Sequence, residues 1–598
     1  MHSFLRACCA SIVCALLAFS ATPRAPVKKT GVSTTSFTVR TWLRTMTLRD
    51  KAAQLIIMPI YGEPAHRRSA MSKKYDHFVR DLHVGGLIVT GHSMASGIKN
   101  AEPYAMAALL NRMQKISKLP LLVGADFERG ASMRVNSTTA WPYNMAFAAA
   151  QDVDGVFAEA AETAREARAL GVNWIFAPVA DINNNPDNPI INIRSYGENP
   201  AQVSKFVRAY IQGAHSERLS PVLVTAKHFP GHGDSAVDSH LGLAAISADR
   251  QRLESVEFEP FRAAIAAGVD SIMTAHIAVP ALESENVPAT VSSKIITGVL
   301  RDELGFHGIT ITDAMDMQGL TANFSTAEAA VRAIEAGNDV LLMPKRAEDA
   351  INGVVGAVQS GRITKQRLDQ SVAKVLTAKI QLGLLRKRIV DLDGIADQVD
   401  SPESEERAQQ VSDHAVTLVN DRKDQLPLRN AESACLITLS ENRHGQQGLR
   451  LIEEMKKRAP NMTATALDPG MSPADLDQVA QKSAGCGQII VAAFVSVAAY
   501  RGNVALAGSF PDFLNGLLAG KVPVTLASLG NPYLARNFPN AAAYLTTYSP
   551  TPSSEASLAK VLFGEIPLTG RLPITIPGFA KLGDGIQLPA VHPPQKGL

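Results

Sequence analysis

Eight short apolar segments recur between residues 52 and 344, and stretches with the composition of surface helices separate them. Strands that alternate with helices in this way are typical of a parallel sheet, because a helix returns the chain to the edge where the next strand starts. Eight such units predict a (β/α)8 barrel of the TIM type. If one segment were not a strand, an open doubly wound sheet would be the alternative. The segments span residues 53–60, 86–90, 121–125, 174–179, 222–226, 271–275, 308–312 and 339–343.

The pattern changes after the last of these segments. Apolar residues at helical spacing over 364–385 predict a helix that completes a barrel domain covering 35–385. Residues 386–406 are charged and poor in large apolar side chains, which indicates a linker. The remainder, 407–598, predicts a smaller doubly wound α/β sandwich domain. Its expected strands lie at 415–419, 435–439, 488–494, 522–528 and 541–547.

The N-terminus has the order of a secretory signal peptide, predicted at residues 1–21. Arg6 precedes an apolar run over 7–19, and the small residues Ser20 and Ala21 follow it. The run is too short for a permanent membrane span, so a secreted or periplasmic protein is expected after cleavage. A buried N-terminal helix is the alternative.

The cysteines agree with an exported chain without proving it. Cys8, Cys9 and Cys14 would leave with the signal peptide, and Cys435 and Cys486 would remain. These two allow one disulfide in an oxidising compartment, or two buried free thiols.

The charge balance argues against nucleic acid as a partner. The chain holds 59 Lys and Arg against 56 Asp and Glu, a net charge of +3, without a basic block. An uncharged sugar polymer fits this balance better.

The densest group of reactive side chains is Lys-His-Phe-Pro-Gly-His-Gly-Asp at 227–234, followed by Asp238, Ser239 and His240. It follows the apolar segment 222–226, so it lies at the C-terminal end of a predicted barrel strand. Active sites of parallel α/β proteins collect at that end.

These two motifs together resemble the signature of bacterial β-N-acetylglucosaminidases of glycoside hydrolase family 3. A second family motif, Ile-Thr-Asp-Ala-Met-Asp-Met, occupies 311–317, and the similarity continues to the closing segment 570–577. The resemblance implies an exo-acting, retaining enzyme that needs no cofactor or metal. It also implies N-acetylglucosamine-containing chains as substrate, peptidoglycan fragments first, with chitin oligosaccharides as a further possibility.

Retaining hydrolysis needs a carboxylate beneath the anomeric carbon and a proton donor beside the leaving oxygen. Asp313 directly follows the apolar strand 308–312, and the resemblance aligns it with the family's nucleophile. The alternative is that Asp313 caps the following helix. Asp316, three residues further on, is expected in the first turn of that helix rather than in the chemistry.

The expected acid/base is a histidine. Asp238 and His240 are two residues apart, so in an extended chain their side chains project to the same side and the carboxylate can orient the imidazole. Such a pair supplies a proton and fixes which ring nitrogen faces the substrate. A solvated loop Asp and His is the alternative.

The resemblance also implies a set of sugar-binding residues. Hydrogen bonds to charged groups are strong, which suits a ligand with many hydroxyls. One departure from the family is the run Glu128-Arg129-Gly130 where Gly-Gly-Arg is frequent, which leaves Arg129 without a role. His232 and the glycines beside it are expected to shape the loop. The implied sugar-binding residues are Asp126, Arg134, Arg194, Lys227 and His228.

Three other functions stay open. A metal-dependent hydrolase could use the histidines and aspartates of 228–240 as ligands. A family 3 β-glucosidase or xylosidase would take its acid from a glutamate elsewhere, and a catalytically silent protein would only bind sugar. A further hypothesis is that phosphate replaces water as the acceptor, because a neutral imidazole repels an anion less than a carboxylate does. No residue of the second domain is assigned a role.

Overall fold

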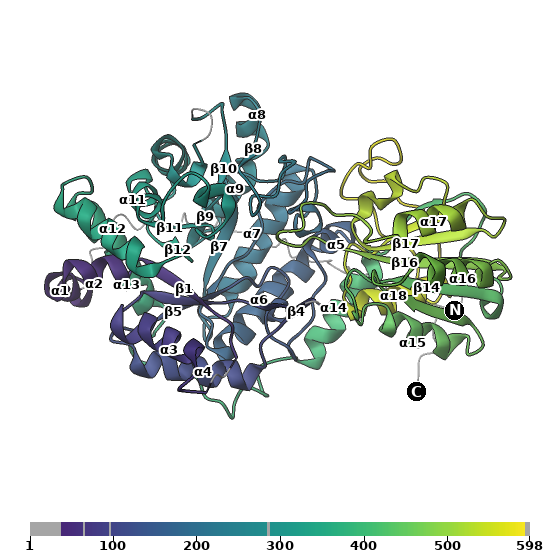
Figure 1. The fold of residues 1–598 in the computed structure, drawn as a ribbon, viewed down its shortest axis with the longest axis horizontal. Helices are drawn as coiled ribbons and strands as arrows, with labels where there is room; N and C mark the ends of the chain where they lie inside the picture. Colours follow the sequence, from purple (N-terminus) through teal and green to yellow (C-terminus); the bar gives the residue numbers. More distant parts are fainter. Residues whose placement is uncertain (1–36, 64–65, 95–96, 284–286, 592–598) are drawn as a thin grey trace, which may run out of the picture.

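The computed structural model describes residues 37–591, apart from 64–65, 95–96 and 284–286. A barrel and a smaller sheet domain lie side by side, the barrel in purple to teal and the second domain in green to yellow (Figure 1). The predicted signal peptide and its three cysteines lie outside the described residues. Among the helices that are described, none combines the length and apolarity needed to cross a bilayer.

All eight predicted barrel strands are present in one parallel sheet with the order β11-β9-β7-β6-β5-β2-β1-β12. A bridge between Ile311 and Val340 brings β11 beside β12, so the barrel is nearly closed. The strands are buried on both faces, which explains why they are continuous apolar segments without alternation. Their bounds are β1 Ile56–Ile60, β2 Gly86–Val89, β5 Leu122–Ala125, β6 Trp174–Ile175, β7 Leu223–Phe229, β9 Ser271–Thr274, β11 Ile309–Thr312 and β12 Leu341–Leu342.

Some strand limits differ from the prediction. β1 begins at Ile56 because Ala53 still belongs to the helix α2. β6 has only two residues, since the chain leaves the regular ladder before Pro178. β7 extends to Phe229, which places Lys227 and His228 inside the strand.

Helices surround the barrel (Figure 1). The helix predicted at 364–385 is α13, where the Thr364 side chain accepts the backbone N–H of Arg367 and caps the first turn. The helices before the second domain are α1 Phe37–Thr45, α2 Leu48–Ala53, α3 Ala70–Asp76, α4 Pro103–Ile116, α5 Asn144–Ala149, α6 Val153–Leu170, α7 Pro200–Ser216, α8 Arg250–Ser255, α9 Glu259–Ala266, α10 Gln318–Thr321, α11 Thr326–Ala336, α12 Ala347–Gln359 and α13 Lys365–Gln381.

Several short elements lie between the strands and helices of the barrel. The hairpin β3–β4 and the parallel pair β8–β10 lie outside its main sheet. Two π-helical segments, η1 and η5, precede β2 and β11. The bounds are β3 His92–Met94, β4 Gly97–Lys99, β8 Ala244–Ala245, β10 Ile277–Ala278, η1 His77–Asp81, η2 Ala131–Met133, η3 Asn192–Arg194, η4 Ala289–Val291 and η5 Lys294–Glu303.

The second domain is a six-stranded sheet with the order β13-β18-β17-β16-β14-β15, parallel except for β13. Apolar clusters cover both faces, so the doubly wound fold is confirmed. The edge strand β15 escaped prediction because its sequence, Thr-Ala-Thr-Ala-Leu, has a single large apolar residue. The strands are β13 Thr417–Asp421, β14 Ala434–Leu439, β15 Thr463–Leu467, β16 Gln488–Val495, β17 Val524–Gly530 and β18 Ala543–Thr546.

The helices of this part begin with α14, whose first residue lies inside the segment predicted as a linker. Cys435 on β14 and Cys486 before β16 form a disulfide with a Cα–Cα distance of 5.9 Å, which answers the question that the sequence left open. The helices are α14 Pro402–Ala415, η6 Ala431–Ser433, α15 Leu449–Arg458, α16 Pro473–Ser483, α17 Phe510–Leu518, η7 Pro532–Arg536 and α18 Pro552–Leu562.

The closing segment 570–577 fastens the second domain to the barrel. The backbone N–H of Arg571 donates to the Ala149 carbonyl at 3.1 Å, and that of Glu198 donates to the Pro573 carbonyl at 3.1 Å. The Glu198 carboxylate in turn accepts the N–H and the hydroxyl of Thr575, both at 2.7 Å. Residues far apart in the chain therefore form one interface.

Glu166 on α6 makes a second, buried connection, to the chain just before α14. Its Oε1 accepts the backbone N–H groups of Thr139 and Asp400, both at 2.9 Å, while Oε2 has no partner. Burial raises the pKa of Glu166 to about 7, although the hydrogen bonds oppose the shift.

This raised pKa predicts a pH-dependent stability. A carboxyl protonated in the folded state contributes stability below its unfolded pKa, near 4.5, and that contribution is lost as pH rises through about 7. The full change corresponds to about 3 kcal/mol. We expect Glu166→Gln, which keeps an oxygen at Oε1, to unfold at a higher temperature than the parent at pH 8 but not at pH 4.5. Thermal unfolding at the two pH values checks this, and an equal difference at both would contradict it.

Candidate active site

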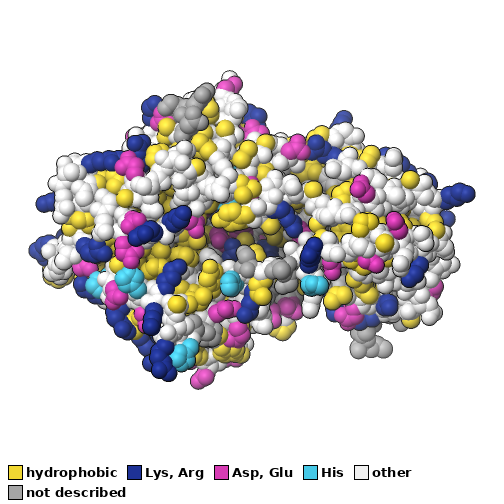
Figure 2. All heavy atoms as spheres, in the orientation of Figure 1, with side chains coloured by type: hydrophobic (Ala, Val, Ile, Leu, Met, Phe, Trp, Pro, Cys, Tyr) yellow, Lys and Arg dark blue, Asp and Glu magenta, His cyan; other side chains and the backbone are white. Residues whose placement is uncertain are grey.

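A cavity of about 570 Å³ opens at the C-terminal ends of the barrel strands, where the second domain meets them. Figure 2 shows the surface hollowed at this place. Every residue that the sequence singled out for binding or catalysis lines it, except Asp238, which lies behind His240. The second domain also contributes to its wall, through Glu441, Asn442, Gln447, residues 496–501 and Pro550.

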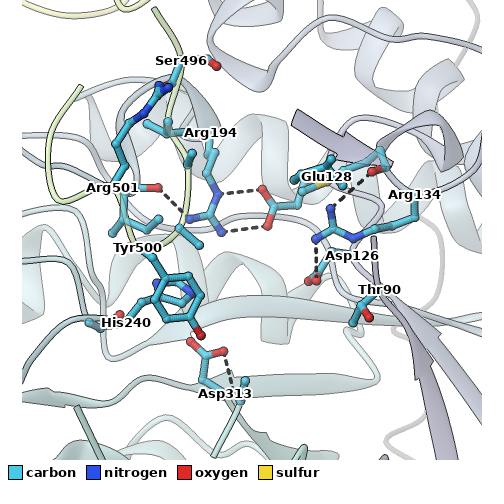
Figure 3. Close-up of a pocket in the computed structure, with 18 of the residues that line it drawn as sticks. Thr90, Asp126, Glu128, Arg134, Arg194, His240, Asp313, Ser496, Tyr500 and Arg501 are labelled. Atoms are coloured by element: carbon cyan, nitrogen blue, oxygen red, sulfur yellow. Dashed lines mark hydrogen bonds and ion pairs between the residues drawn. The ribbon is translucent and has the colours of Figure 1, made fainter. Parts of the chain in front are cut away.

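Asp313 stands where β11 ends, half-buried at the cavity wall (Figure 3). Its backbone N–H donates to the Thr274 carbonyl at 2.9 Å, which extends the β11–β9 pairing by one residue. Burial alone would raise the pKa of this carboxyl, but the nearby His228, His276 and His240 lower it to about 2. Asp313 is therefore an anion at neutral pH.

Asp316 does not lie in a helix, contrary to the prediction. It occupies a turn that precedes α10, and its side chain is exposed at the cavity. Partial desolvation by the surrounding cavity walls, together with the charge of Asp313, nevertheless raises its pKa. Asp313 at the strand end is therefore the more buried carboxylate of the cavity, and Asp316 in the following turn lies nearer to solvent.

Asp238 and His240 do form a pair, but not in an extended chain. The segment is a turn in which Asp238 Oδ1 accepts both the backbone N–H of His240, at 2.9 Å, and its ring Nδ1–H, at 2.7 Å. An aspartate that binds the N–H two residues ahead forms an Asx turn, so the local backbone itself builds the dyad. Asp238 is buried, and His240 lowers its pKa against the effect of burial.

A buried ion-pair network forms the opposite wall (Figure 3). Glu128, which the sequence analysis left unassigned, accepts two hydrogen bonds from Arg194, both at 2.8 Å, and pairs with Lys227 at 2.6 Å. Lys227 also donates to Asp126 at 2.8 Å, and Arg134 donates to the other oxygen of Asp126 at 3.1 Å. Four predicted side chains and Glu128 thus form one continuous ion-pair network.

The network keeps these groups ionised despite their burial. Burial would raise the pKa of Glu128, but Arg194 and Lys227 hold it well below the usual range. Burial would lower the pKa of Lys227, but Asp126 and Glu128 raise it. Fixed charges of both signs in a concave site suit hydrogen bonds to sugar hydroxyls.

His228 is oriented by a carboxylate that sequence reasoning missed. The buried Asp181 accepts its Nδ1–H at 2.7 Å and also the backbone N–H groups of His228 and His232. His228 Nε2 therefore faces the cavity, 3.5 Å from Arg194 Nη2. Asp181 sits after β6 within a run of polar residues, where no motif marked it.

His232 lines the cavity, and the loop that carries it holds its ring. Both of its ring nitrogens bind hydroxyls, Ser235 and Ser239, each at 2.9 Å, and burial lowers its pKa to about 4. Gly231 has a φ of +125°, whereas Gly233 is required by close approach, because a Cβ there would lie 1.6 Å from the Ile182 carbonyl oxygen.

The arrangement does not resemble a metal centre. Within the described ranges, no group of three or more His, Cys, Asp and Glu side chains is placed to hold a metal ion. Each candidate histidine has a different partner instead. His228 binds Asp181, His232 binds two serines, and His240 binds Asp238.

The fold and the site define a glycoside hydrolase, because a barrel mouth presents an ionised carboxylate, a carboxylate-oriented imidazole and a wall of charged hydrogen-bonding groups. The Glycosyl hydrolase family 3 N terminal domain matches residues 47–378, more than half of the chain. The protein belongs to glycosyl hydrolase family 3.

Similar proteins span different lengths of the chain. A β-N-acetylglucosaminidase/β-glucosidase of Cellulomonas fimi is 28% identical over 561 residues, 90% of this chain and 95% of that one. A β-hexosaminidase of Xylella fastidiosa is 32% identical over 335 residues, 53% of this chain and 96% of that one. The structure of a family 3 β-N-acetylglucosaminidase from Paenibacillus sp. str. FPU-7 superposes with a TM-score of 0.79 at 31% identity, over 89% of this chain and 99% of that one.

The buried charge network predicts a large effect of neutralising Glu128. Glu128→Gln keeps the shape but leaves Arg194 and Lys227 short of a counter-charge, and breaking a buried ion pair costs about 3–5 kcal/mol. We expect a clear fall in unfolding temperature. The matched control is Glu254→Gln, which removes the exposed pair with Arg250 and should cost less than about 1 kcal/mol. Equal effects of the two changes would contradict the role of the network.

Proposed function

We propose that this protein is an exo-acting, retaining β-N-acetylglucosaminidase that removes N-acetylglucosamine from the non-reducing end of a glycan. The observation that carries the proposal is the Asp238–His240 pair, which shares one cavity with Asp313. The name of the Paenibacillus relative supports N-acetylglucosamine, that of the Xylella relative supports a hexosamine, and that of the Cellulomonas relative includes both N-acetylglucosaminidase and β-glucosidase.

In this mechanism Asp313 attacks the anomeric carbon and forms a glycosyl-enzyme intermediate, while His240 protonates the leaving oxygen. Asp238 holds Nδ1, so Nε2 is the nitrogen that faces the substrate. After the leaving group departs, the neutral imidazole accepts a proton from water, which then attacks the intermediate. The pKa of Asp313, at about 2, keeps the nucleophile ionised throughout the neutral range.

The charged wall would bind the sugar hydroxyls. Asp126 offers acceptor oxygens, Lys227 and Arg134 offer donors, and Arg194 and His228 lie beside them. Because these groups are already paired and buried, little side-chain freedom is lost when a sugar binds.

A β-glucosidase that takes its acid from a second-domain glutamate fits the site less well. Glu441 is the glutamate of that domain at the cavity. Its two oxygens accept hydrogen bonds from Ser496, Gln447 and Arg501, so neither is free to face a leaving group.

The natural substrate and location belong to the same proposal. The predicted signal peptide supports a secreted or periplasmic enzyme, where peptidoglycan fragments would be available. Chitin oligosaccharides carry the same terminal sugar and form the alternative substrate.

Replacing Asp313 with Ala should abolish hydrolysis of 4-nitrophenyl β-N-acetylglucosaminide, because no intermediate can form. The parent should prefer this substrate to 4-nitrophenyl β-glucoside and should keep its activity in excess chelator. Steady-state rates on both substrates check the proposal. Preference for the glucoside would contradict the assigned sugar, and loss of activity with the chelator would contradict the assigned mechanism.

Replacing His240 with Ala should lower kcat/KM, which reports the glycosylation step, about 10²–10⁴-fold for substrates with poor leaving groups and spare it for those with good ones, because only the former need a proton donor in that step. A series of aryl β-N-acetylglucosaminides of graded leaving-group pKa measures this. Equal losses along the series would argue against His240 as the acid.

A further inference from the structure

The loop 496–501 of the second domain lies against the buried Asp238. The backbone N–H of Tyr500 donates to Asp238 Oδ2 at 3.0 Å. The other oxygen, Oδ1, is occupied by the two bonds from His240. Each oxygen of this carboxylate is therefore held by a different domain, and its plane is fixed from both sides.

The ring of Tyr500 also contacts the dyad directly. It meets the His240 imidazole edge to face, with centroids 4.9 Å apart and planes at 64°. Its residue is 58% exposed and lines the cavity, and Figure 3 shows the ring extending from beside His240 toward Asp313. An aromatic side chain of the second domain thus bounds the space in which the imidazole can move.

The backbone of Tyr500 is in an unfavourable conformation. Its φ is +66°, a left-handed value that is uncommon for a bulky residue and that glycine would adopt without strain. Gly502, two residues on, does provide a glycine with a φ of +72°. The strained position aims the Tyr500 N–H at Asp238, and strain of this kind is characteristic of functional sites.

A buried carboxylate anchors both ends of the loop. Glu441, just after β14, accepts the backbone N–H of Ser496 at 2.6 Å, its hydroxyl at 2.8 Å and Arg501 Nη1 at 2.7 Å. Gln447 donates to the same carboxylate at 2.9 Å. The loop is thus clamped to the strand ends of the second domain.

We propose that Tyr500 is a positioning residue for the Asp238–His240 dyad, held in place by the Glu441–Arg501 clamp. This inference rests on the proposed function. The Tyr500 N–H stops the Asp238 carboxylate from rotating, and the ring limits the tilt of His240. Because a proton donor displaced by about 1 Å can lose about 10²-fold in rate, the second domain then controls the acid step of a reaction whose other groups belong to the barrel.

The test is Tyr500→Ala, which removes the ring and keeps the backbone N–H, on the aryl β-N-acetylglucosaminide series. We expect kcat/KM, which reports the first step, to fall at least about tenfold on the poorest leaving group and to change less than about threefold on the best one. A role in folding or in sugar binding alone would lower all members equally. Tyr500→Phe keeps the ring and the backbone N–H and should behave like the parent, as should the control Tyr104→Ala, an exposed tyrosine on α4.

A double mutant tests whether Tyr500 acts through the histidine. In the His240→Ala background, Tyr500→Ala should add no further leaving-group dependence, whereas multiplying effects would overturn the proposal. If Tyr500→Ala does not fold, Arg501→Ala releases the clamp and leaves the tyrosine intact. This variant should show a leaving-group dependence in the same direction as Tyr500→Ala but of smaller size.

The outcomes separate this inference from the proposed function. A flat series for both Tyr500→Ala and Arg501→Ala, alongside a leaving-group-dependent His240→Ala, would overturn the positioning role and leave the glycosidase assignment intact. A flat series for His240→Ala would overturn both.

Discussion

The charged wall of the cavity is held together by the ion pairs of the buried Glu128 carboxylate. This carboxylate pairs with Arg194 of η3 and with Lys227 of β7. Lys227 also pairs with Asp126, which follows β5. Removing several charges from water is costly, and the multiple short hydrogen bonds of this network offset the cost only while all partners are present. The result is a rigid set of donors and acceptors that is formed before any sugar arrives.

The side of the cavity that holds Asp313 and the Asp238–His240 pair is built on a different principle. Asp313 takes its place from the end of a barrel strand, whereas the Asp238–His240 pair lies on a loop and forms through a local Asx turn. A loop is less rigid than a strand end. The second domain compensates by binding the second oxygen of Asp238 through Tyr500, so both domains hold the pair that we propose as the acid/base.

Much of the fold followed from the pattern of apolar segments. All eight barrel strands and five of the six strands of the second domain were predicted, because buried parallel strands are continuous apolar runs. β15 was missed because an edge strand needs no such run. The dyad was correctly paired from its two-residue spacing, but the expected extended geometry was wrong, since an aspartate side chain can bind the backbone N–H two residues ahead.

The order of strands and helices, the reactive loop 227–240 and the carboxylate after β11 could be inferred from local patterns, because they depend on residues close together in the chain. Which distant groups meet became evident only in the folded chain. Glu128 became the centre of an ion-pair network, and Tyr500 reached Asp238 across 262 positions of the chain. Contacts of this kind arise when closing the barrel and docking the second domain bring strand ends and loops together, and no local pattern records them.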